Sequence, residues 1–79
     1  MSVRTHHWAS DRHERKMRLL QFIKDHPGSE KRIIMQVMTK MLKISHRAIM
    51  EYLSELKLED EIENRDGNFY PFGYEAKTE

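Results

Sequence analysis

Residues 37–53 read VMTKMLKISHRAIMEYL, and this stretch decides the predicted fold. Apolar side chains recur there and just beyond at three- and four-residue intervals, at Ile49, Tyr52, Leu53 and Leu56. This spacing places them on one face of a helix. Ser45 comes directly before that face and is a preferred N-cap residue, because its hydroxyl accepts a hydrogen bond from a free backbone N–H of the first turn. The stretch therefore predicts one helix that ends at Leu42, a short turn, and a second helix over 45–57.

Upstream, a further helix is predicted to begin at Ser10 or Asp11 and to end at the Asp25-His26-Pro27-Gly28 segment. Asp11 and Glu14 have the spacing of a capping box, in which two side chains satisfy free N–H groups at a helix start. Proline disfavours helix at the residue before it, and glycine permits a turn.

The segment that follows is predicted to form a helix capped by Ser29, with Glu30 in its first turn. Only Gln36, Thr39 and Lys40 interrupt its apolar surface between Ile33 and Leu42. A helix that is apolar over most of its circumference lies between other elements. Three of its apolar residues, Met35, Met38 and Met41, are interpreted as flexible core filler.

Downstream, residues 62–64 and 69–70 are predicted to be two short strands joined by a turn at Asp66-Gly67. The Asp-Gly pair suits a tight hairpin turn, in which both central residues adopt a positive φ. Pro71 either ends the second strand or marks an edge of the sheet.

The chain is 79 residues long, which suits one domain with a modest core. We expect an arm over residues 1–10, a domain over 11–72 and a tail over 73–79. The chain has no cysteine, which excludes disulfides and favours a reducing, cytoplasmic location. No apolar run is long enough to span a bilayer, and the first residues lack the pattern of a secretion signal.

Charge is distributed unevenly along the chain. Residues 1–50 carry eleven Lys and Arg against four Asp and Glu, whereas residues 51–79 carry three against nine. The net charge of +1 therefore conceals a basic first part and an acidic second part. Such polarity suits a protein with one face turned to a polyanion.

The stretch 37–53 resembles a helix-turn-helix, in which an apolar helix end, a turn, an apolar residue and Ser or Thr precede the second helix. Here these positions are held by Leu42, Lys43, Ile44 and Ser45, with the β-branched Ile49 four residues on. The hairpin that follows resembles the winged-helix variant of this family, and especially the small regulators of archaea and their viruses and plasmids. The resemblance implies a mainly α winged helix-turn-helix fold with three helices and a two-stranded wing. Two positions usually given to glycine hold Lys43 and Asp60.

The resemblance implies a sequence-specific double-stranded DNA-binding protein that regulates transcription and is nucleoid-associated. Helix 45–57 would read the major groove, where each base pair presents a distinct pattern of donors and acceptors. Arg47 would bind a guanine edge and Met50 a thymine methyl, whereas Glu51 would either accept from a cytosine amine or repel phosphates and so tune specificity. The other candidate DNA-binding residues are Lys31, Arg32, Lys40, Lys43, Ser45, His46, Ser54 and, in the wing, Arg65.

Other functions were weighed against this one. The five histidines lack the spacing and the accompanying ligands of a metal site, so we expect no metal and no cofactor. We expect no enzymatic activity, because neither a nucleophile motif nor a phosphate-binding loop is present, and we see no small-molecule ligand. The alternative function is a winged-helix protein-interaction module, which the acidic segment from Glu51 to Glu63 favours. RNA binding has less support, since only Phe69 and Tyr70 offer bases a stacking surface.

A homodimer is expected, because a small core leaves Trp8, Phe72 and Tyr74 available for an interface. The same residues would otherwise cover the chain's own core.

Overall fold

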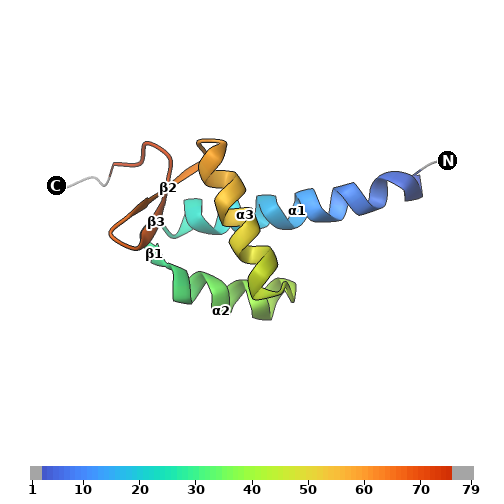
Figure 1. Ribbon diagram of the computed structural model, residues 1–79, viewed down its shortest axis with the longest axis horizontal. Helices are drawn as coiled ribbons and strands as arrows, with labels where there is room; N and C mark the ends of the chain where they lie inside the picture. Colours follow the sequence, from blue (N-terminus) through green and yellow to red (C-terminus); the bar gives the residue numbers. More distant parts are fainter. Residues whose placement is uncertain (1–2, 76–79) are drawn as a thin grey trace.

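The computed structural model describes the backbone of residues 3–75 and the side chains of residues 12–75. The chain is mainly helical with a small antiparallel sheet (Figure 1). In chain order the elements are α1 (Val3–Asp25), β1 (Ser29–Glu30), α2 (Lys31–Leu42), α3 (His46–Leu58), β2 (Ile62–Arg65) and β3 (Asn68–Pro71). The three helices and the hairpin agree with the prediction in type and order.

The core lies where the helices meet the sheet. α1 contacts β3 and α3, and α3 contacts α2 and β2. The buried apolar side chains are Leu19, Leu20, Ile23, Ile34, Met38, Ile44, Ile49, Tyr52, Leu53, Leu56, Ile62 and Phe69. All four residues of the predicted face of α3 belong to this set. The N-terminal half of α1 extends beyond the other elements (Figure 1).

The start of α1 differs from the prediction. The helix begins at Val3, so Ser10 and Asp11 lie within it and residues 3–10 are helical. A capping box satisfies N–H groups only where the preceding backbone leaves the helix, and no glycine or proline interrupts the chain between Val3 and Asp25. The Asp11–Glu14 spacing therefore marks no helix start here. The side chain of Trp8 lies outside the part that the structure describes.

The N-cap of α2 also differs, because Ser29 is not the capping residue. Ser29 Oγ donates a hydrogen bond of 2.6 Å to the carbonyl of His26. Ser29 and Glu30 form β1, which pairs with Phe69 and Asn68 of β3. Glu30 is the N-cap residue in extended conformation, with no side-chain cap hydrogen bond. Glu30 therefore comes before α2 instead of lying in its first turn.

The sheet has three strands in the order β1-β3-β2 instead of the two expected. Gly28, at a φ of 90°, donates its backbone N–H to the Phe69 carbonyl at 2.7 Å, which joins the turn after α1 to the hairpin. The hairpin turn itself is confirmed: Asp66 and Gly67 have φ values of 53° and 85°. Positive φ at both central residues is the geometry that follows the right-handed twist of the strands.

Of the three methionines interpreted as core filler, Met38 is buried and Met35 lies partly buried against the core. The prediction is wrong for Met41, since this side chain is 67% exposed. It belongs to the last turn of α2, where the neighbouring Leu42 is the side chain that packs against the core.

Candidate nucleic-acid interface

The outer face of α3 carries four of the predicted DNA-binding side chains. Arg47, Met50, Glu51 and Ser54 are all exposed. With Glu55 they line an open depression of about 370 Å³. The Arg47 side chain is 90% exposed and lies 4.0 Å from the Glu51 carboxylate, in an ion pair one helical turn long. The face therefore offers a cation, a thioether, a carboxylate and a hydroxyl, which are complementary to the groups on base edges.

The start of α3 is fixed by its own cap. Ser45 Oγ accepts a hydrogen bond from the Ala48 backbone N–H at 3.2 Å, as the sequence predicts. The next residue, His46, is exposed, and no acidic residue lies in the first turn. Backbone N–H groups at such a helix start favour a nearby anion. The beginning of α3 thus suits a phosphate group beside the residues that would read bases.

The turn between α2 and α3 places two lysines close to this helix start. Lys40 lies in the last turn of α2, and Lys43 follows α2 in the left-handed conformation with φ 53° and ψ 42°. Both are exposed. The left-handed conformation occurs at the position where the helix-turn-helix family commonly has glycine, and it costs an L-residue about 1–2 kcal/mol. The strained turn places the Lys43 side chain directly before the start of α3.

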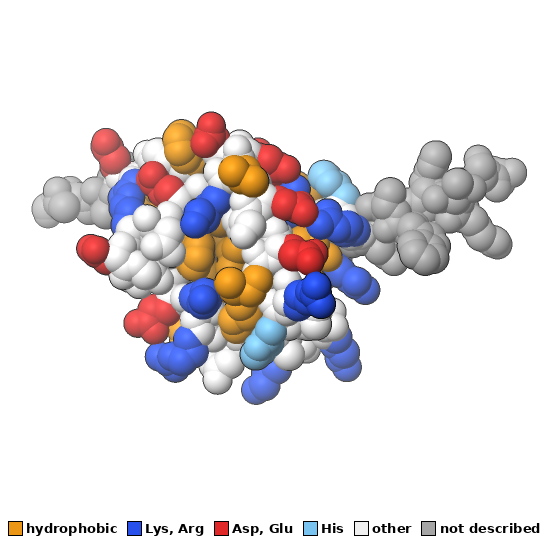
Figure 2. All heavy atoms as spheres, in the orientation of Figure 1, with side chains coloured by type: hydrophobic (Ala, Val, Ile, Leu, Met, Phe, Trp, Pro, Cys, Tyr) orange, Lys and Arg blue, Asp and Glu red, His pale blue; other side chains and the backbone are white. Residues whose placement is uncertain are grey.

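The remaining predicted basic residues are not gathered at this turn. Lys31 and Arg32 begin α2, whose axis separates its two ends by roughly 16 Å. Arg32 also donates to Glu30 at 3.1 Å. Figure 2 shows Lys and Arg side chains along the margin formed by α2 and the start of α3, while acidic side chains gather towards the end of α3 and the hairpin. The basic residues thus form two groups, one at each end of α2.

Arg65 in the hairpin is held against the protein's own surface. Its guanidinium contacts the Glu63 carboxylate, donates to the Tyr74 carbonyl at 2.6 Å and lies 4.8 Å from the centre of the Tyr70 ring. The rings of Tyr70 and Tyr74 stack at 5.7 Å. Arg65 therefore fastens the residues after β3 to the hairpin and does not extend freely from its tip.

An ion-pair cluster between α1 and α3 was not predicted from the sequence. Arg12 donates to both Glu55 oxygens, at 2.6 and 3.3 Å. Lys16 donates to Glu55 at 3.0 Å and to Glu59 at 2.8 Å. The sequence does contain a hint of it: the two cations are four residues apart, and so are the two carboxylates. This spacing places each pair on one helix face. Only the packing of α1 on α3 shows that these faces meet.

This cluster makes the free energy of unfolding depend on pH in the acidic range. The pKa of Glu55 is lowered from its ordinary 4.5 to about 2, chiefly because its carboxylate accepts hydrogen bonds from Arg12 and then from Lys16. A carboxylate with a lowered pKa stabilises the folded state above its unfolded pKa, and that contribution is lost as the pH falls through the folded pKa. We expect the free energy of unfolding to fall between pH 4.5 and about 2, and to fall less in Glu55→Gln. Urea denaturation at a series of pH values measures both, and equal slopes would contradict the role of Glu55.

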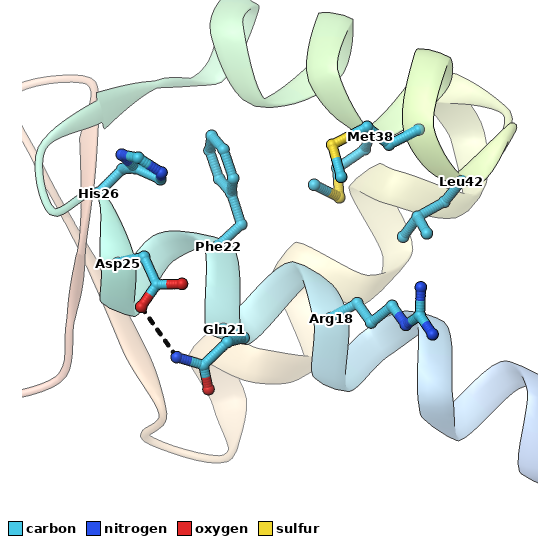
Figure 3. A pocket seen from close by; sticks show the side chains of 8 residues that line it. Arg18, Gln21, Phe22, Asp25, His26, Met38 and Leu42 are labelled. Atoms are coloured by element: carbon cyan, nitrogen blue, oxygen red, sulfur yellow. Dashed lines mark hydrogen bonds between the residues drawn. The ribbon is translucent and has the colours of Figure 1, made fainter.

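A second hollow lies between α1 and α2 and is mostly apolar (Figure 3). Its volume is about 350 Å³, and its lining is Arg18, Gln21, Phe22, Asp25, His26, Met38, Met41 and Leu42. Gln21 donates to Asp25 at 3.0 Å, and the rings of Phe22 and His26 lie 4.7 Å apart. Its lining shares no residue with the depression on α3.

Within residues 3–75, no helix combines the length and the apolar character needed to cross a membrane. Among the side chains of residues 12–75, no three His, Cys, Asp or Glu are grouped in a way that would hold a metal ion. His6 and His7, two of the histidines weighed as metal ligands, lie outside the described side chains.

No known protein family, curated protein or solved structure matches this chain.

Proposed function

We propose that this chain is a winged-helix protein that binds double-stranded DNA at specific sequences and regulates transcription. The observation that carries the proposal is the division of α3 into two faces. Ile49, Leu53 and Leu56 are buried, whereas Arg47 and its neighbours on the outer face are exposed. An α-helix fits the major groove of B-DNA, so an exposed polar helix face with a cation near its start is suited to reading bases.

The arrangement around α3 supports this proposal. Three helices are followed by a hairpin, as the resemblance to winged-helix proteins implies. Lys40, Lys43 and the N-terminus of α3 lie together, and this grouping suits binding to one stretch of phosphate backbone. Lys31 and the start of α2 would contact a phosphate further along. A homodimer would place two such helices on half-sites separated by about one helical turn of DNA or a multiple of it.

Salt dependence of duplex binding tests the proposal. We expect the logarithm of the association constant to fall linearly with the logarithm of salt concentration, with a slope of about −0.9 for each phosphate contacted. Selection of fragments from a random duplex pool supplies the preferred sequence, and fluorescence anisotropy supplies the affinity. No duplex binding at about 50 mM salt would contradict the proposed function.

Lys43→Gly is the informative variant for the phosphate contacts. It removes the ammonium group and relieves the left-handed strain, so the variant is expected to be at least as stable as the unaltered chain. We expect weaker binding to all duplexes alike and a salt slope smaller by about one. Because the fold is not weakened, a loss of affinity reports the missing contact. Lys24→Gly is unsuitable as a control since it would weaken a helix, so Lys24→Ala, an exposed change on α1, serves instead.

A protein-interaction module is the second candidate, and one observation favours it. Leu58 and Phe72 are 85% and 56% exposed, and the acidic residues Glu59, Asp60 and Glu61 follow Leu58 directly. An exposed apolar side chain next to acidic ones suits contact with a basic protein segment. A module of this kind would bind no duplex in the salt titration.

A further inference from the structure

Three carboxylates run along one side of the proposed recognition helix. Glu51 and Glu55 of α3 and Glu59, the C-cap residue directly after it, follow one another at four-residue intervals, so they lie on one side of the helix, one above the other. Two of them, Glu51 and Glu55, line the depression on the outer face. A stripe of negative charge at the edge of this face would repel the phosphate backbone of a duplex lying there.

The structure gives each of these carboxylates a cation. Glu51 is paired with Arg47 of the same helix at 4.0 Å. Glu55 is paired with Arg12 at 2.6 Å and with Lys16 at 3.0 Å, and Glu59 is paired with Lys16 at 2.8 Å. Two of the three partners therefore come from α1, whose described side chains, from Arg12 to Asp25, do not line the depression on α3.

Arg12 and Lys16 are held firmly in these positions. Lys16 is only 8% exposed and bridges two successive turns of α3. Its pKa is raised, chiefly by donation to Glu59 and also by donation to Glu55. The Arg12 guanidinium contacts both Glu55 oxygens and lies 5.1 Å from the centre of the Tyr52 ring. The two-oxygen contact and the ring contact join α1 to α3.

We propose that Arg12 and Lys16 are positioning residues of the DNA interface that act through their charge: they neutralise the acidic side of α3, so that a phosphate backbone can lie beside it. The inference rests on the proposed function and adds α1 to the residues that determine affinity. It explains how a recognition helix with three carboxylates on one side can approach a polyanion.

The deciding experiment compares the single variant Arg12→Gln with the double variant that carries both Arg12→Gln and Glu55→Gln. Arg12→Gln leaves Glu55 with reduced compensation, and we expect the association constant for the selected duplex to fall about threefold to tenfold at about 50 mM salt. The double variant removes the uncompensated carboxylate as well, and its affinity is expected to return to within about twofold of the unaltered chain. A merely structural contact would leave the double variant as weak as Arg12→Gln, because the contact is absent in both, and that result would overturn the inference.

Glu55→Gln alone supplies a second measurement that does not depend on the fold of Arg12→Gln. It frees Arg12, leaves Lys16 paired with Glu59 alone and removes neither cation, so duplex affinity is expected to stay constant or to rise by about threefold. A fall in affinity with an unchanged circular dichroism spectrum would overturn the inference.

Arg15→Gln is the matched control, since it makes the same charge change three residues along α1. Arg15 is exposed and forms no ion pair with the side chains of residues 12–75. An equal loss of affinity in Arg15→Gln and Arg12→Gln would overturn the inference, since net charge would then explain both. If the unaltered chain binds duplex and Arg12→Gln binds equally well, the inference alone fails. If the unaltered chain binds no duplex, the proposed function fails and the inference with it.

Discussion

Leu56→Ala is expected to lower the free energy of unfolding by about 2–5 kcal/mol. Leu56 is 0% exposed and lies among the buried side chains that join α3 to the rest of the core. The substitution removes apolar contacts and leaves a cavity that the surrounding helices fill only in part. A small domain has little stability to lose, so this loss is a large share of the total. Urea denaturation followed by circular dichroism measures the loss.

Leu58→Ala is the matched control for this change. It is the same substitution two residues further along the same helix, but Leu58 is 85% exposed. We expect its free energy of unfolding to stay within about 0.5 kcal/mol of the unaltered chain. Similar losses in the two variants would show that helix propensity, and not burial, determines the effect, and would contradict the assignment of the buried face of α3.

Arg47→Ala is expected to weaken binding to the selected duplex by about 1–3 kcal/mol and to relax the preference at one base pair. The Arg47 side chain is 90% exposed, so its removal leaves the core intact. The variant should unfold at the same urea concentration as the unaltered chain. Anisotropy with the selected duplex and with single-base variants of it measures both the affinity and the preference.

Lys57→Ala is the control, because it removes one cation from the opposite end of α3. Lys57 is exposed in the last turn of the helix, away from the N-terminal part proposed to enter the groove. It should change affinity far less and leave the base preference unaltered. If Lys57→Ala and Arg47→Ala weaken all duplexes equally, Arg47 contributes only charge and does not read a base.

Elements specified by local chemistry were predictable from the sequence. The Ser45 cap, the buried face of α3 and the positive φ at Asp66 and Gly67 each depend on residues within a few positions of one another. Local hydrogen bonds and periodic burial act over the same range, which is why the pattern was sufficient.

Features that depend on distant partners were not predictable in this way. β1 exists because Ser29 and Glu30 pair with β3, almost forty residues later, and this pairing takes Ser29 away from the cap position. Met41 is exposed although Leu42, in the same last turn of α2, packs against the core. Periodicity shows that a side is apolar but does not show which part of it another element covers.

The candidate site likewise contains features that the local pattern predicts and features that depend on distant partners. The exposure of Arg47, Met50, Glu51 and Ser54 follows from the helical period once the buried face is known. The contacts of Arg65 with Tyr74 and of Arg12 with Glu55 join residues of different elements. The sequence does not show that these residues meet, because the relative placement of their elements is a property of the packed core.

The position of β3 in the sheet determines when the domain can fold during translation. This strand lies in the middle of the sheet, contacts α1, and is the last element of the fold. During translation, β1 and β2 therefore leave the ribosome with no strand between them, and a nascent chain that stops before Phe69 lacks a buried residue of the core. Closure of the domain must therefore wait until β3 has left the ribosome, after α1, α2, α3 and the other two strands have been made.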